Sequence, residues 1–248
     1  YRAISSLKNR KKTHEVDGFY APDCITMSLH VHIIKTWMSN AFLIESSRGM
    51  VLIDAGPPRS ERKILEQMQE LGRDDLQLIF LTHAHYDHFG SVAAIKHQTG
   101  APVAINRIDA DALARAETAL GTVQGSGRFT KMGLPLLEVL MPVPPMQADL
   151  LLDHGDRLDA YGLDAQIIHT PGHTLGSSTL LVENRLAFVG DLVSMMGEPH
   201  AQNRFAVDWR QLAKSLHRLQ QLQPEWVYSG HGPQPLSGEA FQQLRCQY

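Results

Sequence analysis

The sequence LTHAHYDHFG, from Leu81 to Gly90, holds three histidines and one aspartate within six consecutive positions. It follows LQLIFLT, from Leu76 to Thr82, an apolar run of strand length that is typical of a strand covered on both faces. The polar cluster therefore begins where a buried strand ends. A metal site at the edge of a sheet is one interpretation of this cluster, and a plain polar loop is the other.

Metal ligands are the residue types that the cluster offers. Zinc and comparable ions take imidazole nitrogen and carboxylate oxygen, which His83, His85, Asp87 and His88 supply. In an extended chain, side chains two residues apart point the same way, so His83 and His85 can bind one ion. Asp87 and His88 lie just past the strand, where the loop turns them elsewhere, and could hold a second ion. One ion would be crowded by all four ligands, so the spacing favours two ions side by side.

Further candidate ligands stand at the ends of three later apolar runs. These are IIHTPGHTLGSS with His173, LAFVGDLVS with Asp191 and WVYSGHGP with His231. Each of the three residues is next to a glycine at a strand-to-loop boundary, where glycine lets the backbone turn and approach a ligand closely. The same design thus occurs four times along the chain, which indicates that the four loops contribute to one site.

Taken in order, these residues make the chain resemble the metallo-β-lactamase-fold hydrolases, whose members share an H-x-H-x-D-H loop followed by a distant His, Asp and His. The resemblance runs from about Leu29 to about Pro235 and includes the sequences VLIDAG and TPGHT. It implies an α/β fold, a four-layer αβ/βα sandwich with the site along the top of two sheets. It also implies the ligand sets: His83, His85 and His173 for the first ion, Asp87, His88 and His231 for the second, and Asp191 as the bridge between them.

The organisation of the chain agrees with an α/β fold. Strand patterns are expected at 25–35, 41–45, 50–54, 76–82, 102–106, 149–153, 163–169, 178–182 and 185–190, with a last strand in EWVYSGHG. Helices are expected after Ser60, after the histidine cluster up to Gly100, and at the leucines around Leu216. We expect one domain over residues 1–248.

Residues 109–148 interrupt this alternation, and we interpret them as an inserted helical cap. Residues 109–123 are rich in Ala and Leu, whereas 124–148 mix Gly, Pro, Met and Leu without strand alternation. An insertion of this length is more often functional than idle. If the cap folds over the metals, the residues expected to line the acyl side of the pocket are Leu134, Leu136, Leu137 and Met141. The alternative is that these side chains only pack the cap onto the body.

Some polar residues near the cluster have two open interpretations. Tyr86 could contact substrate. Asp54 either caps the turn after its strand or orients a ligand histidine, and His169 could support a ligand from behind. His14, His97, His200 and His217 are interpreted as solvated or hydrogen-bonded histidines, and His30 and His32 as the surface of a strand.

Composition limits the partners that we expect. Lys and Arg number 23 against 26 Asp and Glu, a net charge of -3, and no basic block predicts a nucleic-acid surface. No apolar run approaches the roughly 18 to 20 residues of a membrane helix, and the two cysteines, Cys24 and Cys246, have no zinc-finger spacing. We therefore expect a cytoplasmic protein with a small-molecule substrate, no nucleic acid and no membrane partner. The oligomeric state stays open, with a homodimer as one possibility.

Charge counting predicts a mechanism. The charge of two divalent ions exceeds that of Asp87, Asp191 and a bridging hydroxide together, so the site stays cationic. Water between such ions loses a proton near neutral pH, which predicts a metal-bound hydroxide as the nucleophile, with Asp87 as a carrier of the proton. Zinc is the expected metal, and iron or manganese would fit the same ligands. The sequence contains neither a GxxxxGK phosphate loop nor a G-x-S-x-G elbow.

Departures from relatives narrow the expected substrate. Secreted class B β-lactamases carry Cys at the position of Asp191, and glyoxalase II enzymes carry a basic helical C-terminal domain, for which residues 232–248 are too few. The remaining expectation is a dinuclear hydrolase of a small ester, thioester or lactone. The alternative is a mononuclear iron enzyme of the same fold that acts like a persulfide dioxygenase, although such enzymes keep a reduced ligand set.

Overall fold

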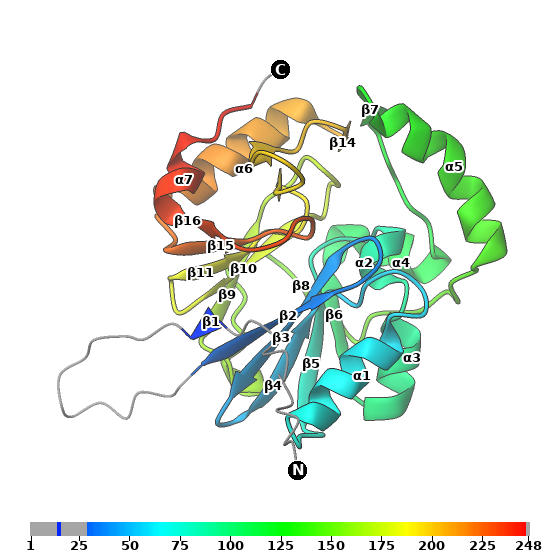
Figure 1. Cartoon of the computed structure of the whole chain (residues 1–248), viewed down its shortest axis with the longest axis vertical. Coiled ribbons are helices and arrows are strands. Elements are labelled where there is room, and N and C mark those ends of the chain that lie inside the picture. The colour runs from blue at the N-terminus through cyan, green and yellow to red at the C-terminus, as the bar shows by residue number, and fades with distance from the viewer. Residues whose placement is uncertain (1–13, 16–28, 247–248) are drawn as a thin grey trace, which may run out of the picture.

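Two β-sheets lie face to face, and helices cover the outer side of each (Figure 1). The structure is a computed structural model and describes residues 14–15 and 29–246. Cys24 and the first residues of the expected strand 25–35 lie outside this part of the chain. The helix–sheet–sheet–helix order confirms the four-layer sandwich that the sequence predicts.

The first sheet has seven strands in the order β1-β2-β3-β4-β5-β6-β8. Their bounds are β1 His14–Glu15, β2 His30–Lys35, β3 Asn40–Ser46, β4 Gly49–Ile53, β5 Leu76–Leu81, β6 Val103–Asn106 and β8 Leu150–Leu152. The strands from β1 to β4 pair antiparallel, whereas β4, β5, β6 and β8 run parallel. Strand β5 thus lies inside the sheet between β4 and β6, as its mostly apolar sequence predicts.

The second sheet has five strands in the order β16-β15-β11-β10-β9. Their bounds are β9 Ala165–His169, β10 Ser178–Val182, β11 Leu186–Phe188, β15 Trp226–Tyr228 and β16 Leu236–Ser237. Only β11 and β15 pair in parallel, so the loops that follow these two strands leave the sheet at the same edge.

Helices cover the outer faces of both sheets. Helices α1 Glu61–Glu70, α3 Val92–Thr99 and α4 Ala110–Arg115 pack on the first sheet through side chains such as Ile64, Ile95 and Leu113. Helices α6 Trp209–Gln221 and α7 Gly238–Gln243 pack on the second sheet through Leu216 and Phe241. The short helix α2, Tyr86–Phe89, and the 3-10 turns Arg107–Asp109 and Asp159–Tyr161 complete the helical elements described in this body.

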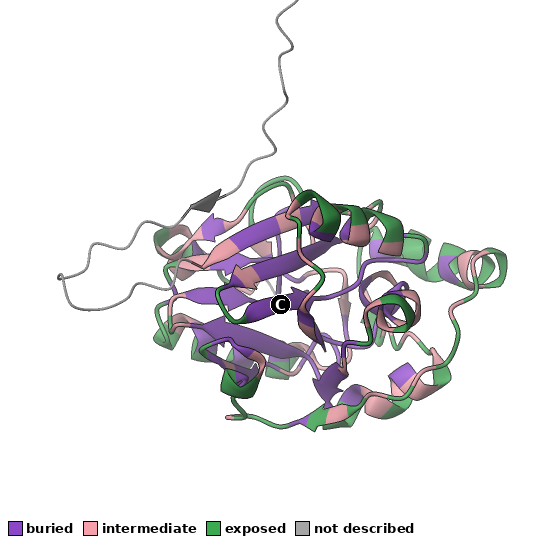
Figure 2. Ribbon diagram, turned by 90° about the horizontal axis from the view of Figure 1, so that it is seen from below, coloured by how far each residue is buried: buried purple, intermediate pink, exposed green. Residues whose placement is uncertain are grey.

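The central core lies between the two sheets. Strand β3 shows how the sequence builds it, because Phe42 and Ile44 face the second sheet while Ala41 and Leu43 face the helices. The ring of Phe42 contacts Phe188 and Tyr228 of the opposite sheet at centroid distances of 5.3 and 5.7 Å. Figure 2 shows this interior as buried strands within a rim of partly exposed helices. The sheets are therefore fixed relative to each other, and so are the loops at their edge.

Residues 109–148 differ from the expectation in their detail. The expected helix 109–123 ends at Arg115, because Ala116 adopts a left-handed conformation with φ of 52°. A second helix, α5 Gly127–Leu140, follows in the stretch 124–148, for which no regular element was expected, and Pro135 lies inside it. Figure 1 shows α5 at the side of the molecule, away from the sheets. Leu113, Val143 and Met146 pack on the core below α1 and α3, so the ends of this segment belong to the body.

Short strands attach α5 to the rest of the chain. Strand β7, Thr122–Val123, pairs with β14, Phe205–Ala206, and β12, Val193–Ser194, pairs with β13, His200–Ala201. The sequence did not predict these two-residue strands or β16, because they are too short to show alternation. None of the helices between residues 29 and 246 has the length and apolar character that crossing a membrane requires.

Candidate metal centre

The predicted ligand loops converge at one edge of the two sheets. Asp191 and His231 follow the parallel strands β11 and β15, and the backbone N–H of Gly230 donates to the carbonyl of Gly190 at 2.9 Å. Across the two sheets, the backbone N–H of Ser178 donates to the carbonyl of Thr82 at 2.9 Å. The histidine loop after β5 is thereby joined to the loops of the second sheet.

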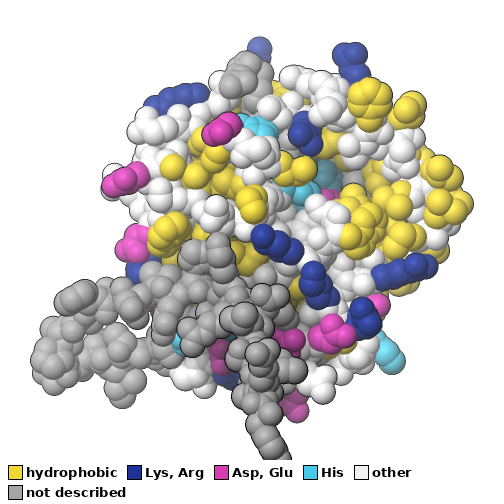
Figure 3. All heavy atoms as spheres, viewed as in Figure 1, with side chains coloured by type: hydrophobic (Ala, Val, Ile, Leu, Met, Phe, Trp, Pro, Cys, Tyr) yellow, Lys and Arg dark blue, Asp and Glu magenta, His cyan; other side chains and the backbone are white. Residues whose placement is uncertain are grey.

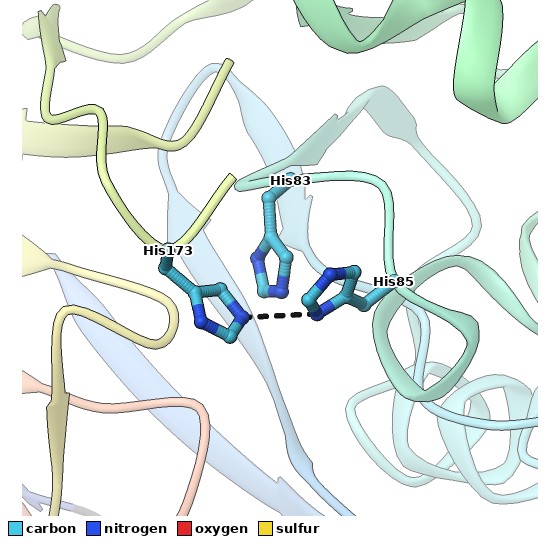
Figure 4. A group of neighbouring side chains, drawn as sticks. All are labelled: His83, His85 and His173. Atoms are coloured by element: carbon cyan, nitrogen blue, oxygen red, sulfur yellow. Dashed lines mark hydrogen bonds between the residues drawn. The ribbon is translucent and has the colours of Figure 1, made fainter. Parts of the chain in front are cut away.

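Three histidines form the first group of potential ligands. Figure 4 shows the rings of His83, His85 and His173 directed toward one another. Their ring centroids lie 4.5 to 4.7 Å apart, and each pair of rings is close to perpendicular. One nitrogen from each ring lies within 4.8 Å of the other two, which is a spacing that can hold a metal ion. His173 Nε2 and His85 Nδ1 approach to 2.9 Å.

The outward nitrogens of two of these rings are held by the backbone. His85 Nε2 lies 3.1 Å from the carbonyl oxygen of Ala119, and His173 Nδ1 lies 3.0 Å from that of Phe205. A carbonyl accepts only from a protonated nitrogen, so the opposite nitrogen of each neutral ring keeps its lone pair. Both lone pairs are therefore available on the inner side of the group.

Asp87, His88 and His231 form a second group. His231 Nε2 lies 3.3 Å from Asp87 Oδ2, and His88 Nε2 lies 3.7 Å from the same oxygen. The carbonyl of Met38 lies 3.0 Å from His231 Nδ1 and fixes that ring from behind. The second group thus has the ligand types and the spacing of a second ion site.

Asp191 lies between the two groups. Its Oδ2 is 3.2 Å from His231 Nε2 and 3.5 Å from His173 Nε2, while its Oδ1 is 3.2 Å from His88 Nε2. One carboxylate therefore reaches histidines of both groups, which is the geometry that a bridging ligand needs.

Several buried nitrogen and oxygen atoms at the centre are placed to bind metal ions and are not hydrogen-bonded to any residue that the structure describes. Three buried atoms there have no hydrogen-bond partner among the described residues: His83 Nε2, His88 Nε2 and Asp191 Oδ1. Buried polar atoms without a partner are rare in folded proteins because each costs about 1 to 3 kcal/mol. Ions bound by these atoms would remove that cost.

The two groups differ in charge. Burial and the neighbouring histidines hold the pKa of His83 well below its usual range, and they lower that of His173 to about 3. Burial also disfavours charge on His231, but Asp191 and Asp87 outweigh it and raise its pKa to about 10. The first group is thus neutral and ready to bind, whereas the second holds a proton that a metal ion must displace.

Asp54 orients ligands from behind, one of the two roles that the sequence left open. Its fully buried carboxylate lies 2.8 Å from His88 Nδ1 and also accepts from the backbone N–H and hydroxyl of Thr82. The Thr82 hydroxyl in turn lies 3.0 Å from His83 Nδ1. One carboxylate therefore fixes a histidine in each group.

Asp109 joins two of the ligand loops, a role that the sequence analysis missed. Its Oδ2 accepts from the backbone N–H of Ala84, between His83 and His85, and from the hydroxyl of Thr174, next to His173. Its Oδ1 accepts from the backbone N–H of Gly176 at 2.8 Å. The signal in the sequence was an acidic residue just past strand β6, at the same sheet edge as the ligands. Such a residue is also typical of an ordinary helix start, so it did not stand out.

Gly230 marks how closely the backbone approaches the centre. A Cβ atom there would lie 2.5 Å from Cε1 of His88 and 2.8 Å from Oδ1 of Asp191. We expect Gly230→Ala to weaken metal binding by about 10- to 100-fold, because these ligands would have to move. Chelator competition measures the affinity. Gly133→Ala, where a Cβ meets nothing within 4 Å, is the matched control, and equal affinities in the two variants would contradict the expectation.

A pocket of about 240 Å³ opens beside both groups. Figure 3 shows histidine side chains at the bottom of a hollow, with hydrophobic side chains gathered at one side. Tyr86 and Leu134 line the pocket, as expected, but the Tyr86 hydroxyl donates to the carbonyl of Met141 at 2.7 Å. Tyr86 thus fixes the end of the cap segment with its polar atom and offers its ring to the pocket.

Three of the expected pocket residues lie elsewhere. Leu136, Leu137 and Met141 are not among the lining residues, and Leu136 is 64% exposed. For Leu136 the reason is helical geometry: residues two apart on α5 point about 200° away from each other, so Leu136 faces outward when Leu134 faces the body. Leu137 and Met141 are half-buried but do not line the pocket. The structure therefore corrects this part of the predicted pocket.

The structure differs from the expectation for His32, which is buried and pairs with Glu45 on the neighbouring strand at 3.1 Å instead of lying on the surface of its strand. His169 Nε2 lies 2.8 Å from the carbonyl of Leu175, outside the ligand cluster. His200 is hydrogen-bonded, as expected, with Nδ1 2.8 Å from the carbonyl of Glu198, and it also lines the pocket. The side chain of His14 lies outside the described residues.

Comparison with known families agrees with the geometry. The family described as "Metallo-beta-lactamase superfamily" matches residues 34–231, from strand β2 to the last candidate ligand. The chain belongs to the metallo-beta-lactamase superfamily. All seven candidate ligands lie within the matched range.

Two curated relatives of this superfamily member are similar over most of their length, and a third over about half of its length. A "Probable metallo-hydrolase" of Methanocaldococcus jannaschii is 28% identical over 201 residues, 79% of this chain and 88% of that protein. A "Probable metallo-hydrolase" of Bacillus subtilis is 29% identical over 235 residues, 85% and 86% of the two chains. A hydroxyacylglutathione hydrolase of Cereibacter sphaeroides is 31% identical over 158 residues, 63% of this chain but 48% of that enzyme.

Solved structures share the fold. TTHA1623 in a di-iron-bound form has a TM-score of 0.64 at 28% identity, covering 87% of this chain and 98% of that chain. A metallo-β-lactamase of Cronobacter sakazakii with an HARLDQ motif has a TM-score of 0.60 at 25% identity, covering 81% and 74%. The α/β sandwich of the superfamily is thus present here.

Proposed function

We propose that this chain is a dinuclear metal-dependent hydrolase of a small-molecule ester, thioester or lactone. The observation that carries the proposal is the placement of Asp191 within 3.5 Å of histidines from both ligand groups, at the bottom of a pocket. The superfamily of this chain and its relatives named as metallo-hydrolases support an enzyme of the metallo-hydrolase class.

The proposed ligand sets are those that the family resemblance implies. His83, His85 and His173 would hold one ion, Asp87, His88 and His231 the other, and Asp191 both. We propose divalent ions, with zinc first and iron or manganese as alternatives, since His and Asp suit all three. The di-iron form of TTHA1623 supports iron as a serious alternative.

The chemistry follows from the proposed site. Two divalent ions would polarise the carbonyl oxygen of a substrate and lower the pKa of a water molecule toward neutrality. Asp87 borders the pocket and directs Oδ2 at His88 and His231, which leaves Oδ1 to take a proton and pass it to the leaving group. Asp54 keeps His88 in place, so its imidazole need not reorganise during the reaction.

The pocket has room for a small molecule. Its volume of about 240 Å³ is below the range typical of drug-sized ligands, and apolar side chains such as Leu120 and Phe205 line it together with the ligands. These features favour a short acyl compound over a polymer. A small-molecule substrate without nucleic-acid or membrane partners is therefore part of the proposal.

Metal analysis combined with a hydrolysis screen tests the proposal. We expect two metal ions per chain by elemental analysis, and turnover in a panel of esters, thioesters and lactones but not of phosphodiesters or β-lactams. One iron per chain with oxygen consumption on a persulfide would instead support the mononuclear dioxygenase. Two ions without turnover of any carbonyl compound in the panel would exclude the proposed substrate class.

A further inference from the structure

The pocket beside the metal centre contains a cation that the proposed chemistry does not use. Among its lining residues, Arg204 is the one permanent positive charge. Asp87 and Asp191 also border the pocket, but they are directed at the histidines of the two ligand groups. Arg204 therefore stands apart from the ligand network while sharing its pocket.

The guanidinium of Arg204 has no partner within the described part of the chain. It forms no ion pair with a carboxylate within 4.0 Å and no side-chain hydrogen bond among residues 14–15 and 29–246. Most other arginines of the body are paired, for example Arg73 with Asp75 and Arg157 with Asp159. An unpaired guanidinium on a residue that lines the pocket offers five donors to an incoming anion.

The backbone holds Arg204 in a fixed place relative to the ligands. Its N–H donates to Gln202 Oε1 at 3.0 Å, and Gln202 Nε2 donates to the carbonyl of Asp191 at 3.3 Å. Its own carbonyl accepts from the N–H of Gln124 at 2.9 Å. The next residue, Phe205, provides the carbonyl that holds His173. Arg204 is thus tied to the proposed bridge and stands next to the support of another ligand.

This placement indicates a second recognition point for substrate. Guanidinium groups bind carboxylates with two parallel hydrogen bonds. The backbone that carries this guanidinium is already held in place, which lowers part of the entropic cost of binding. Apolar lining residues, including Leu120 and Leu134, suit a short hydrocarbon link between two polar ends. We propose that the substrate carries, besides the group that is hydrolysed, a carboxylate that Arg204 binds. This inference rests on the proposed hydrolase function for the reacting end.

A pair of isosteric esters tests the inference through catalysis. Mono-4-nitrophenyl adipate carries the terminal carboxylate, and 4-nitrophenyl 6-methylheptanoate replaces it with an isopropyl group of the same number of heavy atoms. With spontaneous hydrolysis subtracted, we expect Arg204→Gln to lower the ratio of the two kcat/KM values by about 10- to 100-fold, the effect of one charged hydrogen-bonded pair. An unchanged ratio would overturn the inference.

Direct binding tests it without any turnover. Isothermal titration calorimetry of the metal-loaded protein measures the affinities for adipate and for 6-methylheptanoate. These two ligands differ in the same way as the esters, by a terminal carboxylate in place of an isopropyl group. We expect Arg204→Gln to weaken adipate by about 10- to 100-fold and 6-methylheptanoate by less than about threefold. Equal weakening of both ligands, or of neither, would overturn the inference. If adipate binding depends on Arg204 but neither ester is hydrolysed, the carboxylate site stands and the ester-hydrolase proposal fails.

Arg210→Gln is the matched control. Arg210 is exposed at the start of helix α6 and is not among the pocket residues. The substitution Arg210→Gln removes one positive charge from the protein, as Arg204→Gln does, so it measures the long-range electrostatic effect alone. A change of the ester ratio in Arg210→Gln as large as in Arg204→Gln would show that net charge, rather than contact with Arg204, sets the preference.

Discussion

Asp191→Ala is expected to remove both metal ions and to lower kcat/KM by at least about 1,000-fold. The carboxylate lies within 3.5 Å of His88, His173 and His231, so its loss takes a ligand from each group at once. Two-metal chemistry contributes several kcal/mol of transition-state stabilisation, and every 1.36 kcal/mol corresponds to a factor of ten in rate. Metal content by elemental analysis and initial rates on the best substrate measure the two effects.

A second substitution separates a bridge from an ordinary ligand. Asp87→Ala removes a carboxylate from the group with His88 and His231 only, so we expect it to lose one ion and keep the other. Asp74→Ala, at an exposed position, should keep both ions and full activity. If Asp191→Ala loses a single ion, as is expected for Asp87→Ala, the bridging assignment is wrong. Circular dichroism must show that both variants are folded.

Much of this centre could be predicted because its ligands are marked locally. The alternation of His83 and His85 at the end of a buried strand, and the glycines beside His173 and His231, are features of short sequence segments. The strands around them were also predictable, since a strand buried on both faces is apolar throughout. The facing of the two sheets came from the family resemblance, and the order of strands within each sheet was not predicted, because no local pattern specifies which strands meet.

The residues that support the centre could not be found in the same way. Asp109 acts through partners far away in the sequence, and its own neighbourhood resembles a helix start. Helix α5 was also missed, since Gly133 and Pro135 lower helix propensity. Tertiary contacts hold it in place, among them the burial of Leu134, the pairing of β7 with β14 and the hydrogen bond from Tyr86 to Met141. Its outward-facing Leu136 shows that the direction of a side chain depends on helix phase, which composition does not give.

Asp109→Ala is expected to destabilise the protein by about 3 to 5 kcal/mol and to weaken the three-histidine group. The buried carboxylate accepts hydrogen bonds from the backbone of Ala84 and Gly176 and from Thr174, and its loss leaves these buried donors without a partner. For a chain of this size, that loss corresponds to a fall in Tm of roughly 6 to 20 °C. Thermal unfolding of the metal-free protein measures the stability change without interference from bound ions.

A role in positioning requires more than lost stability. Because Asp109 holds the backbone on both sides of the first group, the folded variant at low temperature should bind the ion at His83, His85 and His173 about 10- to 100-fold more weakly. The ion of the second group should be affected less. Asp111→Ala, two residues away and exposed, is the matched control for charge and helix context. Equal Tm values for the two variants would remove the structural role of Asp109. A lower Tm with unchanged affinity at the three histidines would leave Asp109 as a stabilising residue that does not position the ligands.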